Sequence, residues 1–325
     1  MKVHQLLLTG LIIFSAQSVF AQGCSDAGFC TMGAMKPSQV YTRKINFKLR
    51  SAELSYGRAK TTLSPVITAV TADLTFGLNE KTSFQFKLPY YWVSGNLGET
   101  SGLSDISYSF TRNMYSTEKF HINATLGGKI PTNKSDLDSE VEQQFLSDGL
   151  AAGASTDLPM YYQTSLGSWD VVAGGSYISQ KWMFATGIQI ALTENENEFR
   201  WSQWQNYPSE SYLNSHPHAI NLKRGVDVML RAERAFHFSK WDIRAGLLPI
   251  FRVTKDERTN AMTGAREKVD GSTGMALTAI ASVAYHFNTN NSATLLYGHK
   301  ITDREVNPDG LTRHNVMSIG YVVRF

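Results

Sequence analysis

Large apolar residues recur at every second position along most of this chain. In KTSFQFKLPYYW, the residues Phe84, Phe86, Leu88, Tyr90 and Trp92 share one face, and mostly polar residues lie between them. The same alternation returns in VITAVTADLTFG, KFHINATLGGKI and KWDIRAGLLPIFRV, and in the last nine residues, MSIGYVVRF. A period of two is typical of a β-strand with one apolar face. The pattern predicts about twelve strands, at 43–56, 63–77, 82–94, 103–113, 119–130, 166–178, 181–192, 223–237, 241–253, 273–287, 291–302 and 313–325.

The connections between these strands alternate between short and long. The short ones are LNEK, YSTEK, SQ, FSK and FNTN, whereas the long ones include SGNLGETSG and the stretches 131–165 and 193–223. Short turns at one rim, long loops at the other and an even strand number are typical of outer-membrane barrels. Residues 41–325 are therefore predicted to form an all-β, transmembrane antiparallel β-barrel of about 12 strands. An exported β-sandwich remains the alternative, although it has no reason to collect its long loops at one end.

The last strand carries a second barrel signal. Because a bilayer tolerates no unpaired sheet edge, this strand is expected to pair with the first. Tyr321, Val323 and Phe325 lie on one face and look like the signal that bacterial barrel-assembly machinery recognises. We expect the apolar face to contact outer-membrane lipid, with aromatic residues near the strand ends in the interfacial girdles. These are Tyr90, Trp92, Tyr108, Trp182, Trp241, Tyr297 and Tyr321.

The first residues are typical of a secretory signal peptide. Lys2 precedes an apolar run from Leu6 to about Phe20, and Val19, Phe20 and Ala21 resemble a cleavage site. Residues 1–21 are therefore predicted to be removed on export, which places the mature chain in the outer membrane of a Gram-negative cell. Two alternatives stay open. One is a membrane anchor helix, and the other is a lipoprotein signal with Cys24 as the lipidated residue.

Charge and cysteine content narrow the function further. The formal net charge is +3, from 31 basic and 28 acidic residues, and no basic cluster suggests a nucleic acid partner. The two cysteines, Cys24 and Cys30, are predicted to form a disulfide, since exported chains meet an oxidising compartment. The eight histidines are scattered without catalytic or metal-ligating spacing, so no enzyme activity, cofactor or metal is expected.

Polar residues that alternate with the apolar ones are expected to face the barrel lumen. The candidates are Lys48, Arg50, Asp73, Gln85, Lys87, His121, Lys129, Asp227, Arg231, Glu233, Arg244 and Arg252. An excess of bases would favour anionic or amphipathic solutes, because rings of charge set pore selectivity. The competing interpretation is that these residues pair with one another and fill a narrow barrel.

Three segments bear on whether the lumen is open. Residues 22–40 are predicted to form a periplasmic or plug segment, stiffened by the disulfide, and the loop 131–165 could also fold inward. The loop FRWSQWQNYPSESY concentrates five aromatic residues: Phe199, Trp201, Trp204, Tyr207 and Tyr212. Such a group captures an apolar solute or packs on a neighbouring loop, and the sequence does not decide between these.

Four stretches, in order, resemble one known family. They are FGLNEKTSFQFKLPY, GLSDISYSF, LGGKIPTNKSD and LPMYYQTSLGSWDVVAGGSY. Together they look like the outer-membrane transporters associated with the phenol meta-degradation pathway, distant relatives of the fatty-acid and aromatic-hydrocarbon channels. The chain departs from the family pattern at Ser104 and Asn133, where glycines are expected. The stretch GCSDAGFCTMGAMKP is instead similar to barrels of the Bacteroidetes group.

The resemblance implies an outer-membrane channel for small solutes, hydrophobic or aromatic ones among them, without identifying the solute. The alternative function is a structural or adhesive barrel whose long extracellular loops bind partners.

Overall fold

The computed structural model describes residues 32, 35–36, 48–140, 155–204 and 207–325. The predicted signal peptide and the predicted Cys24–Cys30 disulfide lie outside these residues, as does most of the segment 22–40, so these remain predictions. Within the described residues, no helix is long and apolar enough to cross a membrane.

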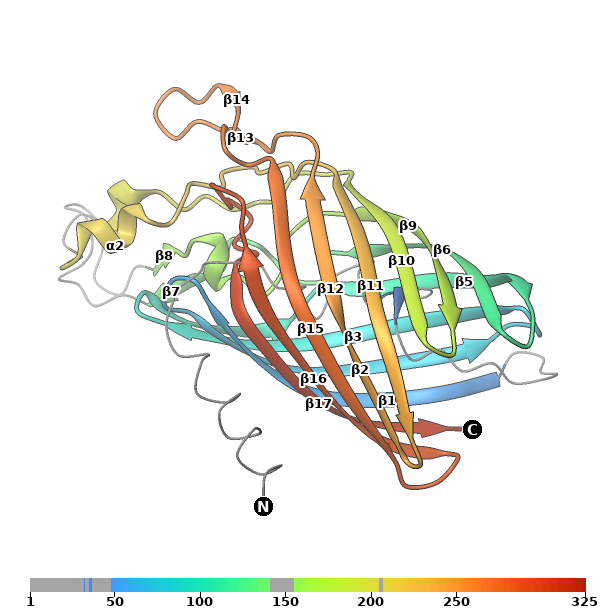
Figure 1. Ribbon diagram of the computed structural model, residues 1–325. Helices are drawn as coiled ribbons and strands as arrows, with labels where there is room; N and C mark the ends of the chain where they lie inside the picture. The colour runs from blue at the N-terminus through green and yellow to red at the C-terminus, as the bar shows by residue number, and fades with distance from the viewer. Residues whose placement is uncertain (1–31, 33–34, 37–47, 141–154, 205–206) are drawn as a thin grey trace, which may run out of the picture.

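The predicted barrel is confirmed: twelve antiparallel strands close on themselves (Figure 1). The wall strands, in chain order, are β1 (Lys48–Thr61), β2 (Val66–Gly77), β3 (Thr82–Gly95), β4 with β5 (Gly98–Leu103 and Ile106–Ser116), β6 (Phe120–Ile130), β9 (Asp170–Ser179), β10 (Trp182–Ala191), β11 (Asp227–Phe238), β12 (Trp241–Arg252), β15 (Gly274–His286), β16 (Asn291–Thr302) and β17 (Arg313–Arg324).

The barrel closes between its last and first strands. β17 pairs with β1 from Ser51 opposite Arg324 to Thr61 opposite Arg313, with one irregularity at Lys60 and Thr61. The amide of Phe325 also donates to the carbonyl of Arg50 across this seam. Closure leaves no unpaired wall strand, which is the condition for a sheet to lie in lipid.

One wall strand is interrupted. The stretch SGNLGETSG, which the sequence predicted as a long loop, forms a tight hairpin between β3 and β4. β3 then pairs with β4 through its second half and with β5 through its first half. The break falls at Ser104 and Asp105, opposite Pro89, whose carbonyl accepts from the Ser104 amide. Proline cannot donate to the ladder, which is why a break is tolerated there.

The outer face of the wall is apolar. Its exposed side chains include Leu54, Phe110, Leu126, Phe184, Leu247 and Ile319. Aromatic pairs lie on the same face, such as Trp182 stacked on Phe184, and Trp241 tilted against Tyr285. This is the surface expected to contact lipid.

The remaining elements lie in the loops at one rim. They are β7 (Asp138–Glu140) paired with β8 (Ser155–Asp157), β13 (Glu257–Thr259) paired with β14 (Arg266–Lys268), the helix α2 (Glu210–Asn214), and the 3₁₀ turns Met160–Tyr162 and Trp201–Trp204. The β13–β14 hairpin and α2 extend from the rim opposite the C-terminus (Figure 1). By the rule for outer-membrane barrels, the long-loop rim is the extracellular one.

Candidate solute pathway

Most of the polar residues singled out in the sequence lie on the buried face of their strands. Arg50, Asp73, Gln85, Lys87, Lys129, Asp227, Arg231, Glu233 and Arg252 are each under one-tenth exposed. His121 and Arg244 are half-buried, and Lys48 is exposed at the first residue of β1. Since the opposite face carries the exposed apolar residues, the polar face lines the inside of the barrel.

Many of these interior groups are paired. Gln85 donates to both oxygens of Asp73, at 2.8 and 3.0 Å, from the adjacent strand. Arg231 pairs with Glu233 two residues along β11 and also donates to the Met35 carbonyl at 3.4 Å. The pairing fits the interpretation of a lumen narrowed by its own ion pairs.

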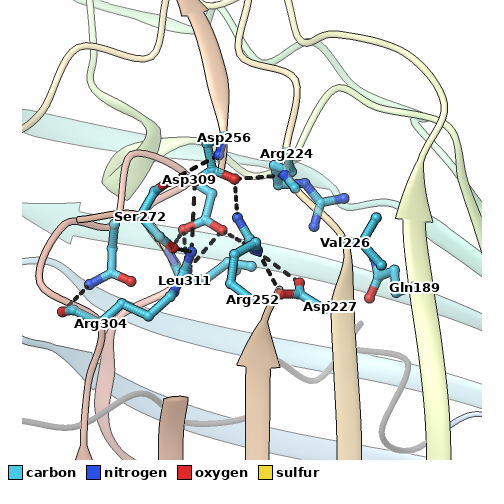
Figure 2. Close-up of polar contacts among 12 residues, drawn as sticks. Gln189, Arg224, Val226, Asp227, Arg252, Asp256, Ser272, Arg304, Asp309 and Leu311 are labelled. Carbon is cyan, nitrogen blue, oxygen red and sulfur yellow. Dashed lines mark hydrogen bonds and ion pairs between the residues drawn. The ribbon is translucent and has the colours of Figure 1, made fainter. Parts of the chain in front are cut away.

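Arg252 is the hub of a buried charge cluster at the long-loop end (Figure 2). Its Nε lies 2.6 Å from Oδ1 of Asp227, which is directly opposite on β11. Its Nη2 lies 2.9 Å from Oδ2 of Asp309, and its Nη1 pairs with Asp256. The Arg252 side chain is 1% exposed. Three carboxylates from three parts of the chain therefore converge on one guanidinium.

Arg304 fastens the loops above the same cluster. Its Nη2 donates to both Asp309 oxygens at 3.2 Å, and its Nη1 donates to the Ser272 carbonyl at 3.2 Å. The Ser272 hydroxyl in turn accepts from the Asp256 amide at 3.0 Å, and the Gly225 amide donates to Asp256 at 2.7 Å. The cluster thus ties the loops 253–273 and 303–312 and the start of β11 together across the barrel mouth (Figure 2).

The two loop carboxylates of the cluster have opposite pKa shifts. Burial alone would raise the pKa of Asp309, but the guanidinium groups of Arg304, Arg252 and Arg224 outweigh it and hold this pKa well below the usual aspartate range. For Asp256, burial dominates and raises the pKa, assisted by the neighbouring Asp309 charge. Asp309 therefore carries the permanent negative charge, and Asp256 is the carboxylate that takes up a proton first.

A second set of ion pairs lies beside the strand break. Lys129 Nζ is 2.9 Å from Asp105 Oδ2 and 3.9 Å from Asp170, which also pairs with Arg224. The amide of Leu166 donates to Asp105 Oδ2 at 3.2 Å, and the Ser165 hydroxyl donates to Asp105 Oδ1 at 2.5 Å. The end of the loop 131–165 is thereby fastened to the wall at the point where β4 gives way to β5.

The described end of this loop fills space at the mouth. Tyr162 is fully buried, and its hydroxyl accepts from the Leu97 amide at 3.0 Å and bonds Tyr212 at 2.9 Å. A cavity of about 30 Å³ lies between this loop and the wall, lined by Tyr91, Lys129 and Arg313 among others. Such a volume accommodates about one water molecule. The prediction that 131–165 folds inward thus agrees with the part of it that is described.

Three described residues of the segment before β1 lie inside the barrel. Met32 and Met35 are 1% and 0% exposed and pack on inward-facing apolar residues of five strands, namely Val172, Met183, Ala185, Met229, Leu248 and Ile280. Lys36 Nζ lies 2.7 Å from both Glu53 and Asp73. These contacts place an apolar obstruction at mid-lumen and fasten it to the wall by charge.

The aromatic loop packs on its neighbours. Phe199 and Trp204 are 0% and 2% exposed and belong to one apolar cluster with Leu158, Tyr162 and Leu213. Trp201 lies on His218, with ring centroids 4.0 Å apart. The sequence left open whether these aromatic residues capture an apolar solute or pack on a neighbouring loop. The described residues of the aromatic loop pack on neighbouring loops.

Sequence patterns missed most residues of the two charge clusters. Arg224, Asp256, Arg304 and Asp309 lie in loops, where alternation assigns no inward face. Asp105 was visible only through the family-like GLSD stretch. Among the described residues, no group of three His, Cys, Asp or Glu is arranged to hold a metal ion.

Comparison with known proteins supports the fold. No family model matches the chain, and no curated protein matches its sequence. Among solved structures, an outer membrane channel of Pseudomonas putida F1 is similar, with a TM-score of 0.54 and 13% identity, over 89% of this chain and 99% of that one. The NanC porin (TM-score 0.44, 7% identity, 86% and 100% covered) and the outer membrane phospholipase A of Escherichia coli (0.35, 8%, 85% and 90%) are more distant. The similarity to the Pseudomonas putida channel is one of fold, that of an outer-membrane barrel.

Proposed function

We propose that this protein is an outer-membrane channel for small solutes. The observation that carries the proposal is the combination of a closed barrel, an apolar outer face and an interior lined by buried polar and charged groups. Twelve strands enclose more space than the eight whose interior side chains fill completely.

Passage requires displacement of what now fills the lumen. Met32 and Met35 occupy its middle, and the Arg252 cluster ties loops over its outer mouth. The apolar stretch at mid-lumen, with charged groups around it, favours hydrophobic or aromatic solutes that carry one polar or anionic group. Support for this finer specificity comes from Met183, Met229 and Ile280, which form an apolar inner wall once the N-terminal methionines leave.

Liposome swelling with the purified protein tests the proposal. Liposomes containing the protein should admit benzoate faster than liposomes without it, and faster than a sugar of similar mass. The double variant Met32→Asp/Met35→Asp should admit both solutes faster still, because charged side chains are expelled from the apolar site. Solute entry equal to that of empty liposomes, for the native protein and for this variant, would contradict a channel.

The competing function, an adhesive barrel, is favoured by one observation. The β13–β14 hairpin protrudes from the long-loop rim, and Met262 at its tip is 92% exposed (Figure 1). An adhesive barrel would give the native protein and the double variant the swelling rate of empty liposomes. Deletion of residues 261–264 should leave solute entry unchanged if the protein is a channel.

A further inference from the structure

Basic side chains gather on the outer face of the barrel at its closing seam. On β1, Arg58 and Lys60 are exposed and share the outward face with Leu54 and Tyr56. On β16, His299 is exposed on the same face as Tyr297. The pairing register places Lys60 opposite Asn315 on β17, and Asn315 opposite His299 on β16. One row across three adjacent strands thus carries two basic side chains, with Arg58 two residues below.

His314 adds a fourth basic group. Its ring lies 5.4 Å from that of His299, edge to face. Its basic neighbours include His299, Lys300 and Lys60. Lys300 itself is buried and paired with Asp303. We call Arg58, Lys60, His299 and His314 the seam patch.

The seam patch has no carboxylate of its own. Among the described residues, no hydrogen bond or ion pair joins Arg58 or Lys60 to another side chain. The outward carboxylate Glu99 accepts from Ser94 at 2.8 Å at the tip of the β3–β4 hairpin. It lies three strands from β1, or about 14 Å at the usual strand spacing.

Elsewhere on the outer face of this rim, large apolar side chains are exposed, namely Trp92, Leu103, Trp169, Leu192, Val253 and Met275. The β3–β4 hairpin adds the exposed polar residues Ser94, Glu99 and Ser101. An outward lysine or arginine is unfavourable in hydrocarbon, and the cost becomes small only near the interface. Two such residues without a counter-ion need an anion that sits at the level of the lipid headgroups.

The barrel wall indicates the depth of the seam patch relative to the membrane. Arg58 and Lys60 lie within three residues of the end of β1 at the long-loop rim, which is the extracellular rim. Tyr56 and Tyr297, just below them, are exposed aromatic residues of the kind that mark the interface. The seam patch therefore lies where the headgroups of the outer leaflet meet the protein.

We propose that the seam patch binds the phosphate groups of an outer-leaflet lipid. Arg58 and Lys60 supply charge-assisted hydrogen bonds to phosphate oxygens, and the imidazoles of His299 and His314 supply further N–H donors. The acyl chains of the same lipid would lie on the apolar face below, along Leu54, Leu295 and Ile319. Because the site spans β1, β16 and β17, a bound lipid would bridge the seam where the barrel closes.

Native mass spectrometry of the purified barrel with added diphosphoryl lipid A tests this proposal. A basic residue near an anionic lipid surface is worth about fivefold in affinity, so the double variant Arg58→Gln/Lys60→Gln should bind about 25-fold more weakly. Arg112→Gln is the matched control, since Arg112 is exposed on the outer face at the opposite end of β5. It should bind lipid A as the native protein does.

Further binding measurements test whether the phosphate groups of the lipid are what the seam patch recognises. Lipid A stripped of both phosphates should bind the native protein as weakly as the intact lipid binds the double variant. Equal binding of lipid A to the native protein and the double variant would overturn the proposal, as would displacement of lipid A by equimolar inorganic phosphate. Should the double variant fail to fold, Lys60→Gln should bind about fivefold more weakly and Lys60→Arg like the native protein, and equal affinities of these two would overturn it.

Discussion

Lys36 Nζ lies 2.7 Å from Asp73 Oδ2 and an equal distance from Glu53 Oε2, so one ammonium joins the segment before β1 to the inner wall. Glu53 and Asp73 are directly opposite each other on β1 and β2. Like charges placed directly opposite on adjacent strands repel. Lys36 removes this repulsion and at the same time fixes the position of Met32 and Met35 in the lumen.

If the barrel is the channel proposed above, replacement of this lysine should therefore open it. In Lys36→Gln, the two carboxylates lose their shared cation, and the obstructing residues lose their anchor. Single-channel conductance in a planar bilayer, or the time spent open, should rise severalfold. Lys134→Gln is the control, because Lys134 is 72% exposed and 3.8 Å from its partner Asp136. A Lys36→Gln channel with native conductance would show that these residues do not obstruct the path.

Removal of the Arg252 guanidinium should loosen the outer mouth. Arg252→Met leaves Asp227, Asp256 and Asp309 without their common partner in a buried site. Breaking a buried ion pair by removing one partner costs about 3–5 kcal/mol. The variant should show a lower heat-denaturation temperature and more frequent channel openings.

The control for Arg252 is Arg258→Gln. Arg258 pairs with Glu267 at 2.8 Å in the protruding hairpin, where both side chains are partly exposed. Exposed pairs contribute about 0.2–1 kcal/mol, so this variant should melt almost as the native protein does. Equal losses in the two variants would contradict a special role for the cluster.

Replacement of the two loop aspartates, Asp309 and Asp256, should change the stability of the protein by different amounts. The depressed pKa of Asp309 means that its stabilisation is present above the ordinary aspartate value and is lost as the pH falls below about 4. The raised pKa of Asp256 has the opposite sign: the folded state holds its proton more tightly than the unfolded state does, so its ionisation opposes folding at neutral pH. Asp309→Asn should therefore destabilise the protein more than Asp256→Asn at pH 7. Melting curves of both variants at pH 7 and pH 4 check this, and the difference should narrow at the lower pH.

The wall was predictable from the sequence because each strand carries its own evidence. Phe84, Phe86 and Leu88 alternate with Gln85 and Lys87, and this alternation alone assigns the outer and inner faces. Closure between β17 and β1 followed from the absence of water in a bilayer.

Two features could not be predicted from the sequence. One breaks the alternation of apolar and polar residues, and the other depends on a partner elsewhere in the chain. The first strand was predicted to end at residue 56, whereas β1 continues to Thr61. Arg58 and Lys60 interrupt the apolar face of β1, so the alternation pattern did not reveal its last five residues. The pairing of Arg252 with Asp309 joins residues 57 positions apart. Alternation shows that Arg252 faces inward, but not which loop carboxylate reaches it.

Acid should loosen the aromatic loop. Burial lowers the pKa of His216 to about 4, and burial with the charges of Arg258 and Arg200 lowers that of His218 to about 4. A histidine with a depressed folded pKa stabilises the fold above its ordinary value of 6.5, and this contribution is lost as the pH falls toward 4. The protection factors of residues 199–204 and 207–218 in hydrogen exchange, corrected for the pH dependence of intrinsic exchange, should therefore fall between pH 7 and pH 4.5.

His216→Phe provides the control for this acid effect. His216 Nδ1 lies 3.0 Å from the Tyr212 carbonyl, and its buried Nε2 has no hydrogen-bond partner among the described residues. Protonation would therefore bury an unpaired N–H group. The phenylalanine variant should keep high protection factors to a lower pH, and an acid response identical to that of the native loop would rule out His216 as its source.

The seam residue Tyr321 should be required for assembly. Its side chain is 47% exposed on the outer face of β17, between Leu54 of β1 and Ala293 of β16. Tyr321→Asp places a charge on the lipid face, which costs up to a few kcal/mol according to its depth. Deletion of Phe325 removes the amide that bonds the Arg50 carbonyl across the seam. Both variants should be exported normally but reach the outer membrane in smaller amounts, as measured by immunoblots of separated membranes.

Met262→Asp is the control, because a charge at an exposed loop tip meets only water and should leave the amount unchanged. Native levels of both seam variants would mean that assembly does not depend on the end of β17.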